Sequence, residues 1–219
     1  MNKELNDYIL KSNTSIIGLV CKDGIVLGAD RQSTAGNLVL NKNSEKITPF
    51  TNYALVACTG SVSDIQRSKK LIAAELKIKE LRSKSRPTIK EAANLYSTVT
   101  YYQIRQFSPI MSIVGSLVAG VNENGTAELY SIEPAGSVIK VDDYDANFGS
   151  GMPFILGLLE RQYKKGLTVQ EGVELAKESL KSSTQRDVGS GFGIDIYTIT
   201  KDGIKKVVSQ EIAPSFKDD

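Results

Sequence analysis

Three polar residues near the N-terminus of this 219-residue chain have types and a spacing that could support hydrolysis. Thr14 stands directly before an apolar run, and its hydroxyl is a potential nucleophile. Asp30 follows the apolar run 25–29, and Lys46 is a cation with which this carboxylate can pair. A buried lysine needs such a neighbour to stay charged. Each residue taken alone is typical of an ordinary strand or strand end, so the spacing indicates only a candidate site.

The chain contains no histidine, and this absence limits the available chemistry. It excludes Ser-His-Asp and Cys-His catalysis and the commonest zinc-ligand sets. A hydrolytic reaction must therefore take its base from a carboxylate, a lysine or a free α-amine. A free α-amine on Thr14 would have a reference pKa of about 7.7–8.0, which suits a general base near neutral pH. An amide nitrogen cannot act as a base, so residues 1–13 would first have to be removed.

The composition predicts a soluble globular protein, with 41% hydrophobic residues, 24% charged residues and a net charge of +2. The length suits one substantial domain, and the balanced charge predicts no binding to nucleic acid or to a membrane surface. The apolar run 8–10 is too short for a signal peptide, and no run approaches a membrane span. Cys21 and Cys58 lack a CxxC spacing, so we expect reduced, buried thiols in a cytoplasmic protein.

Hydrophobic periodicity predicts groups of strands separated by pairs of helices. Strands are expected at 15–20 and 25–29 around an Asp23-Gly24 turn, at 53–58, 110–120 and 127–132, and at 194–200 and 204–208. Helices are expected at 62–84, from Pro87, near Pro153 and from Thr168, where Thr168 and Glu171 form a capping box. An α+β four-layer αββα sandwich would bury every apolar face. A two-layer α+β fold fits the periodicity almost as well.

The segment 14–46 resembles the opening of mature proteasome β-type subunits. In that family a threonine nucleophile precedes an apolar strand and a glycine, followed by a Lys-Asp turn, an acidic residue before arginine and a lysine at the end of a loop. The matching residues here are Thr14, Gly18, Lys22-Asp23, Asp30-Arg31 and Lys46. The resemblance continues in order through 59–64, 149–151 with Pro153, and 185–187 with 190–191, to about residue 212. It implies the four-layer fold of the N-terminal-nucleophile hydrolases.

The resemblance also implies a role for each matching residue. Thr14 would attack a peptide carbonyl to give an acyl-enzyme that water hydrolyses, while Lys46 lowers its proton affinity and Asp30 holds that lysine. The Gly60 N–H would donate to the oxyanion. Further residues would position the threonine amine and a catalytic water; they are Ser150, Asp187 and Ser190.

The family's substrate pocket falls here on small and mostly uncharged side chains. These predict an apolar pocket without a fixed charge, and the positions are Ser33, Ser44, Thr48, Cys58 and Val62. No metal ion or organic cofactor is implied.

The partners implied by the resemblance are further β chains in heptameric rings, of one or two β types, stacked between rings of α subunits. A regulatory ATPase would act through the α rings, and the substrate would be unfolded polypeptide inside a closed chamber. Residues 1–13 would be a propeptide or a retained arm, and residues 14–219 a single domain.

Asn13 departs from the family, whose processed subunits carry glycine directly before the nucleophile. Glycine reaches positive φ without cost and leaves the attacked carbonyl open, whereas asparagine adds bulk. Two hypotheses follow from this difference. The chain is either a zymogen of a threonine endopeptidase, activated by autocatalytic cleavage between Asn13 and Thr14, or an unprocessed, catalytically silent ring subunit beside an active β partner.

Two other classes fit the sequence less well. An α-type proteasome subunit carries an N-terminal helix and a tyrosine-rich opening motif, which this short arm lacks. An unrelated amidohydrolase with an N-terminal nucleophile would share the layered fold but not the motif at 187–191.

Overall fold

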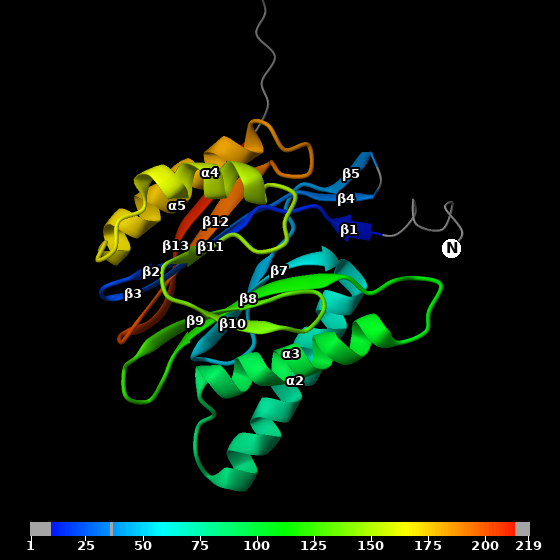
Figure 1. Ribbon diagram of the computed structural model, residues 1–219, viewed down its shortest axis with the longest axis vertical. Coiled ribbons are helices and arrows are strands. Elements are labelled where there is room, and N and C mark those ends of the chain that lie inside the picture. The colour runs from blue at the N-terminus through cyan, green and yellow to red at the C-terminus, as the bar shows by residue number, and fades with distance from the viewer. Residues whose placement is uncertain (1–9, 36, 213–219) are drawn as a thin grey trace, which may run out of the picture.

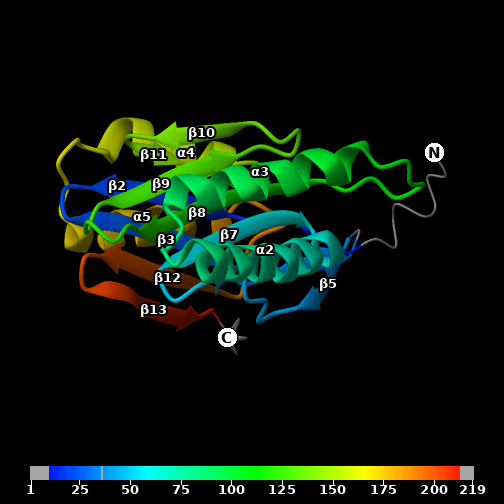
Figure 2. The ribbon, with the colours of Figure 1, turned by 90° about the horizontal axis from the view of Figure 1, so that it is seen from below.

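The computed structural model describes residues 10–35 and 37–212 of the chain, and in this part it contains two antiparallel sheets and four helices. The sheets stack face to face, and one helix pair covers the outer side of each (Figures 1 and 2). The four-layer αββα sandwich predicted from the sequence is therefore confirmed, and the two-layer alternative is wrong.

The smaller sheet has the strand order β11-β2-β3-β12-β13. Its strands are β2 (Ile16–Cys21), β3 (Gly24–Asp30), β11 (Tyr144–Asp145), β12 (Gly193–Thr200) and β13 (Gly203–Glu211). Pairing is antiparallel throughout, and Ile194 of β12 stands opposite Asp30 of β3. The end of β3 and the start of β12 therefore meet at one edge of the sandwich.

The larger sheet has the order β10-β9-β8-β7-β1-β4-β5, with β6 also paired to β7. Its longer strands are β7 (Ala54–Ser61), β8 (Val114–Val121) and β9 (Ala127–Ile132), and the shorter strand β10 (Val138–Val141) forms one edge. Its short strands are β1 (Leu10–Ser12), β4 (Ser33–Ala35), β5 (Leu38–Asn41) and β6 (Ile47–Pro49). Strand β1 lies between β4 and β7, so residues 10–12, shortly before Thr14, are part of this sheet.

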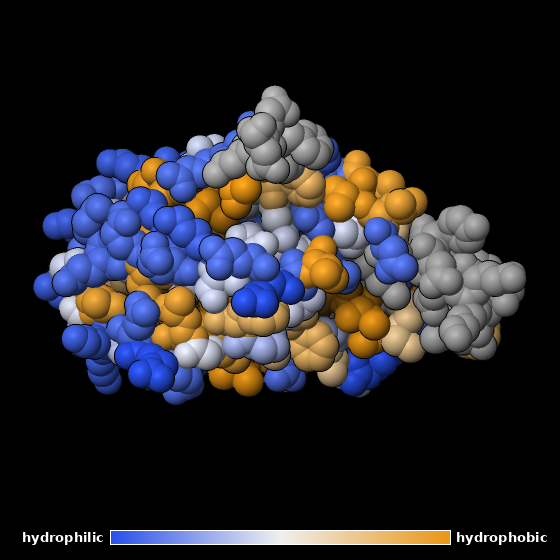
Figure 3. Space-filling model, turned by 90° about the horizontal axis from the view of Figure 1, so that it is seen from above, coloured by the Kyte–Doolittle hydropathy of each residue, from blue (hydrophilic) through white to orange (hydrophobic). Residues whose placement is uncertain are grey.

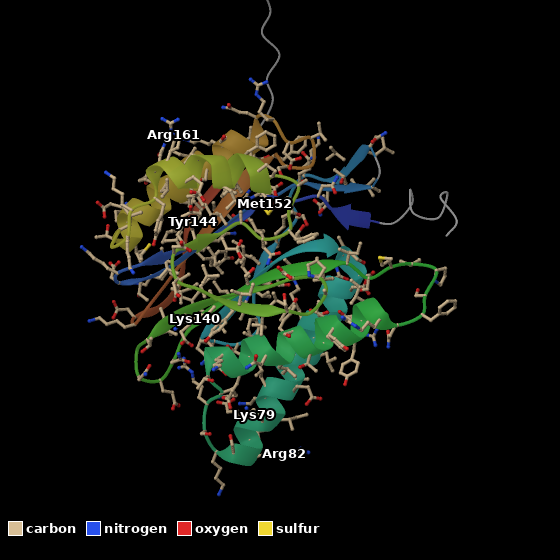
Figure 4. The ribbon with its side chains drawn as sticks, in the orientation of Figure 1. Lys79, Arg82, Lys140, Tyr144, Met152 and Arg161 are labelled. Carbon is tan, nitrogen blue, oxygen red and sulfur yellow. The ribbon has the colours of Figure 1, made fainter. Side chains whose placement is uncertain are left out.

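The helices are α2 (Val62–Ser83), α3 (Ile89–Arg105), α4 (Met152–Gln162) and α5 (Val169–Thr184). Helices α2 and α3 pack on the larger sheet and α4 and α5 on the smaller one. Lys79 on α2 forms an ion pair of 2.6 Å with Glu91 on α3. Figure 4 shows Lys79 on one outer helical layer and Met152, the first residue of α4, on the opposite side of the sheets. Two of the helices start with a capping box, Thr88 with Glu91 and Thr168 with Glu171.

Strand β3 shows why its sequence is continuously apolar. Ile25, Leu27 and Ala29 face the core between the two sheets, while Val26 faces the core beneath α4 and α5. Successive side chains of a strand point to opposite faces, so a strand that is covered on both sides needs apolar residues at every position. The strand becomes polar only at Asp30, where the layers end.

Several local predictions were wrong in detail. Pro87 does not open α3, because Thr88 is the N-cap and the helix starts at Ile89. Residues 110–113 lie outside β8, and the strand predicted at 53–58 runs from Ala54 to Ser61. The short strands β1, β4, β5, β6, β10 and β11 were not predicted, because two to four residues give no readable periodicity. None of the described helices is long and apolar enough to cross a membrane.

Candidate active site

Lys46 is the centre of a buried polar cluster that includes Thr14. The Lys46 ammonium donates to Thr14 Oγ1 at 3.0 Å, to Asp30 Oδ1 at 2.7 Å and to the carbonyl oxygen of Asn13 at 3.2 Å. Thr14 and Asp30 are almost fully buried, and so is Lys46. An ammonium group has three N–H donors and no acceptor, so these three oxygens suit a charged lysine. One cation therefore touches both the candidate nucleophile and the carbonyl group that precedes it.

Asp30 is held by backbone donors in addition to Lys46. Its carboxylate accepts from the N–H groups of Ser15 at 2.9 Å, Gln32 at 2.9 Å and Gly191 at 3.0 Å. Burial raises the pKa of Asp30, and the charge and hydrogen bonds of these donors oppose that rise. Burial lowers the pKa of Lys46, and Asp30 opposes that fall. Each partner thus favours the charged form of the other against the effect of burial.

A second chain of hydrogen bonds reaches the backbone nitrogen of Thr14. The Thr14 N–H donates to Ser150 Oγ at 3.1 Å, and Ser150 Oγ donates to Asp187 Oδ2 at 2.7 Å. Ser190 Oγ donates to the same carboxylate oxygen at 2.5 Å and lies 2.8 Å from Ser15 Oγ. These hydroxyls and the Asp187 carboxylate would surround an amine if the peptide bond before Thr14 were cut.

Three glycines in this region leave room that a side chain would fill. An added Cβ at Gly149 would overlap the carbonyl oxygen of Thr14, and one at Gly151 would overlap Ser15 Oγ. Gly60, near the end of β7, has a φ of +112°, and an added Cβ would overlap the carbonyl oxygen of Ile113. Only glycine adopts that conformation at low cost, so position 60 requires glycine both for its backbone angle and for its space.

The predicted substrate-pocket residues line one cavity of about 450 Å³. All five are present, together with Lys46 of the central cluster. The same wall also contains Glu45, Gln66 and Lys69. The prediction of an apolar pocket without a fixed charge is therefore wrong. Helix α2 contributes Lys69 and the loop before β6 contributes Glu45 to the lining, and both are charged.

Neither cysteine is suited to be a competing nucleophile. Cys58 lies at the pocket wall with its thiol 3.2 Å from the Tyr96 hydroxyl, and burial raises its pKa. Burial also raises the pKa of Cys21 to about 12, with Asp23 adding to the shift. Both thiols are free, buried and protonated at neutral pH, and a thiol is far less nucleophilic than a thiolate.

Strand β1 occupies the groove beside Thr14. Lys11 is in register with Thr34 of β4 on one side and with Ser61 of β7 on the other, and Ser12 stands opposite Gly60. An extended peptide that adds a strand to a sheet is a common mode of peptide recognition. The groove between β4 and β7 therefore has the geometry to bind an extended polypeptide, and here it binds the chain's own arm.

The structure brings five of the predicted catalytic residues together around Thr14 through contacts that join residues up to 175 positions apart, and these are Asp30, Lys46, Ser150, Asp187 and Ser190. The sixth, Gly60, stands opposite Ser12 of β1. The structure also adds residues that the sequence did not indicate. Ser15 donates to Asp30 through its backbone and contacts Ser190 through its hydroxyl, while Gln32 and Gly191 supply further N–H donors to Asp30. Backbone donors carry no residue-type signal, so only the position of Ser15 next to Thr14 could have suggested a role.

Among the described residues, no cluster of histidine, cysteine, aspartate or glutamate side chains could hold a metal ion.

Two antiparallel sheets between helix pairs, with a threonine before an inner strand and a buried lysine beside it, define the class of N-terminal-nucleophile hydrolases.

Comparison with known proteins places the chain within this class. A family model described as proteasome subunit matches residues 10–199, and the chain therefore belongs to the proteasome subunit family. It is 42% identical to a proteasome subunit beta of Nanoarchaeum equitans over 194 residues, which is 89% of this chain and 96% of that protein. It is 37% identical to the proteasome subunit beta of Archaeoglobus profundus over 95% of this chain and 94% of that one.

These relatives support a β-type subunit. Subunits of this type are generally threonine peptidases, and the family assembles into rings with α subunits.

Proposed function

We propose that this chain is a threonine endopeptidase that removes its own residues 1–13 and then hydrolyses unfolded polypeptides inside the closed, cytoplasmic chamber of a proteasome core particle. One observation carries the proposal. The Lys46 ammonium lies 3.0 Å from the Thr14 hydroxyl and 3.2 Å from the carbonyl oxygen of Asn13, so it contacts both groups that must react to cut this bond.

In the processing step, Thr14 Oγ1 attacks the carbonyl carbon of Asn13. The Lys46 N–H donated to the Asn13 oxygen stabilises the negative charge that develops there. The C–N bond then breaks, the proton lost by the Thr14 hydroxyl ends on the Thr14 nitrogen, and residues 1–13 are held as an ester on Oγ1. Water hydrolyses this ester, which releases residues 1–13 as a carboxylic acid and regenerates the hydroxyl.

The new α-amine replaces the histidine that the chain lacks. It would lie beside Ser150, which contacts the same nitrogen at 3.1 Å and is itself held by Asp187. An amine in this position can accept the hydroxyl proton when Thr14 attacks a substrate carbonyl, and can return it to the leaving amine. The Gly60 N–H would donate to the oxyanion of that reaction.

Processing would also empty the groove between β4 and β7. Residues 10–12 occupy it as strand β1 in the full-length chain, so an uncut chain blocks its own substrate groove. A substrate strand would take the same place and would direct a side chain into the cavity lined by Ser33, Thr48 and Cys58. Hydrophobic side chains are also exposed on β5, which pairs with the outer side of β4; they are Leu38, Val39 and Leu40. Figure 3 shows further apolar side chains in several patches of the face that it draws. Neighbouring subunits in a ring would cover such a surface.

The experiment is the intact mass of this chain after assembly with its α subunits. We expect a mass equal to residues 14–219 in particles that hydrolyse peptides. A full-length mass in a fully assembled, hydrolysing particle that contains another β type would contradict the proposal.

Thr14→Ala supplies the matched control, because it removes only the hydroxyl and one methyl group. It should abolish both processing and peptide hydrolysis in particles whose β rings contain only the variant. Unchanged hydrolysis by those particles would exclude Thr14 as the nucleophile.

The second candidate is an unprocessed, structural ring subunit. The pairing of β1 with both β4 and β7 favours it, because this pairing gives the arm a stable place in the sheet. The mass measurement distinguishes the two candidates directly.

A further inference from the structure

The loop that follows α5 lies directly against the residue that precedes Thr14. Asp187 and Ser190 of this loop belong to the active-site cluster, and Gly189 lies between them. An added Cβ at Gly189 would overlap the Cβ of Asn13, and it would lie 3.2 Å from Asn13 Cγ and 2.8 Å from Ser150 Oγ. The Asn13 side chain therefore fills the space that a side chain at position 189 would need.

The backbone of Gly189 does not itself require glycine. Its φ lies outside the left-handed region, in contrast to that of Gly60 or Gly193, so alanine could adopt the same conformation. The hydrogen bond from the Gly189 N–H to Asp187 Oδ1, 3.1 Å long, would also survive this substitution. The requirement at position 189 is therefore one of space, which Asn13 fills most closely and which Ser150 Oγ also borders.

We propose that Gly189 is a positioning residue for the removal of residues 1–13, and that it is the feature of this fold that allows asparagine instead of glycine before Thr14. The space left by the missing side chain at position 189 receives the Cβ of Asn13. The Asn13 carbonyl therefore stays within reach of the Lys46 ammonium at 3.2 Å, where the attack must occur. This inference rests on the proposed self-processing and names the residue that makes it compatible with Asn13.

Gly189→Ala should displace Asn13, because two Cβ atoms cannot occupy the same place. A displacement of about 1 Å at a reacting carbonyl costs on the order of 100-fold in rate. We therefore expect Gly189→Ala to slow the appearance of the chain 14–219 about 100-fold. The effect should depend on residue 13, so in the double variant with Asn13→Gly the rate should return to within about threefold of Asn13→Gly alone, as a coupled pair requires.

The experiment mixes each purified full-length chain with α subunits and follows the intact mass with time. The chains are the wild type, Gly189→Ala, Asn13→Gly and the double variant. Gly157→Ala is the matched control, because an added Cβ on this α4 glycine meets no atom within 4 Å. It should process at the wild-type rate.

Two outcomes would overturn the inference. One is wild-type processing by Gly189→Ala, and the other is slow processing that Asn13→Gly does not restore, which would place the effect on Ser150 or on the fold as a whole. If Gly189→Ala fails to assemble, assembly itself becomes the readout: recovery with Asn13→Gly supports the coupling, and its absence contradicts it. The wild-type sample tests the proposed function separately. A wild-type chain that keeps its full-length mass in particles that hydrolyse peptides would refute that function, whatever the Gly189 variants do.

Discussion

Asp30 and Arg31 are neighbours in sequence, and each forms an ion pair of nearly the same length in a different environment. Asp30 pairs with Lys46 at 2.7 Å, and both side chains are buried between the layers. Arg31 pairs with Asp195 at 2.6 Å nearer the surface, with 11% and 10% of the two side chains exposed, and Lys206 and Ser209 also contact this surface pair.

The difference teaches that distance alone says little about what an ion pair does. The buried pair is cut off from water, so each charge depends on its partner and the cluster holds one protonation pattern beside Thr14. The surface pair keeps some contact with water, and Asp195 has a second, more exposed cation in Lys206, so the carboxylate keeps a partner when Arg31 is lost. The buried pair is suited to supporting a reaction at Thr14. The surface pair is suited to fixing the start of β12 against β13.

Lys46→Met should have the largest effect. It leaves the Asp30 carboxylate buried with only backbone donors, which should lower the free energy of unfolding by about 3–5 kcal/mol. It also removes the ammonium from Thr14 and from the Asn13 carbonyl, so both processing and peptide hydrolysis should fall by at least about 1000-fold. Urea unfolding of the isolated chain and intact mass after assembly measure the two effects. Hydrolysis within about tenfold of the wild type would remove Lys46 from the mechanism.

The double variant Asp30→Asn with Lys46→Met separates stability from activity. With both charges removed, no unpaired charge remains buried, so the free energy of unfolding should recover by about 2 kcal/mol relative to Lys46→Met alone. Peptide hydrolysis should stay at the background level, because the ammonium is still missing. A double variant no more stable than Lys46→Met would show that the pair is not energetically coupled.

Arg31→Met should have an intermediate effect, confined to stability. We expect a loss of about 1.5–3 kcal/mol at neutral pH, with peptide hydrolysis changed less than about tenfold, because hydrogen bonds to a charged group contribute about that much. Burial raises the pKa of Asp195, but the hydrogen bonds from Arg31 and Lys206 outweigh it and hold that pKa below its usual value.

The contribution of the Asp195 carboxylate is therefore present above the unfolded pKa of about 3.9 and is lost as the pH falls through the folded pKa. The stability difference between wild type and Arg31→Met should shrink in acid, as urea unfolding at a series of pH values would show. A difference that grows as the pH falls would contradict the assignment.

Lys206→Ala should have the smallest effect. Its ammonium is partly exposed at 2.9 Å from Asp195, so we expect a loss of less than about 1 kcal/mol, which added salt should screen. Peptide hydrolysis should not change. A larger loss of stability, or a loss that salt does not reduce, would show that the surface pair behaves like the buried one.

Much of the fold could be predicted from local sequence patterns. The β2–β3 hairpin, the continuous apolar run of β3, strand β9 and the Thr168 capping box all depend on residues close together in the chain. The capping box of Thr88 and Glu91 carries the same signal and could have corrected the start predicted for α3. The number of layers could not be read from periodicity, since two-layer and four-layer folds bury the same apolar faces.

The candidate site divides in the same way. The sequence supplied the residue types, the absence of histidine and the departure at Asn13, because these are properties of single positions. The contacts of Lys46 with the Asn13 carbonyl and with Thr14 Oγ1, across 33 and 32 residues, were decided only by the tertiary structure. The close approach of Asn13 to Gly189 was likewise decided only by the tertiary structure. Such contacts exist because packed layers bring the ends of distant strands and loops together, and nothing at either position alone determines that packing.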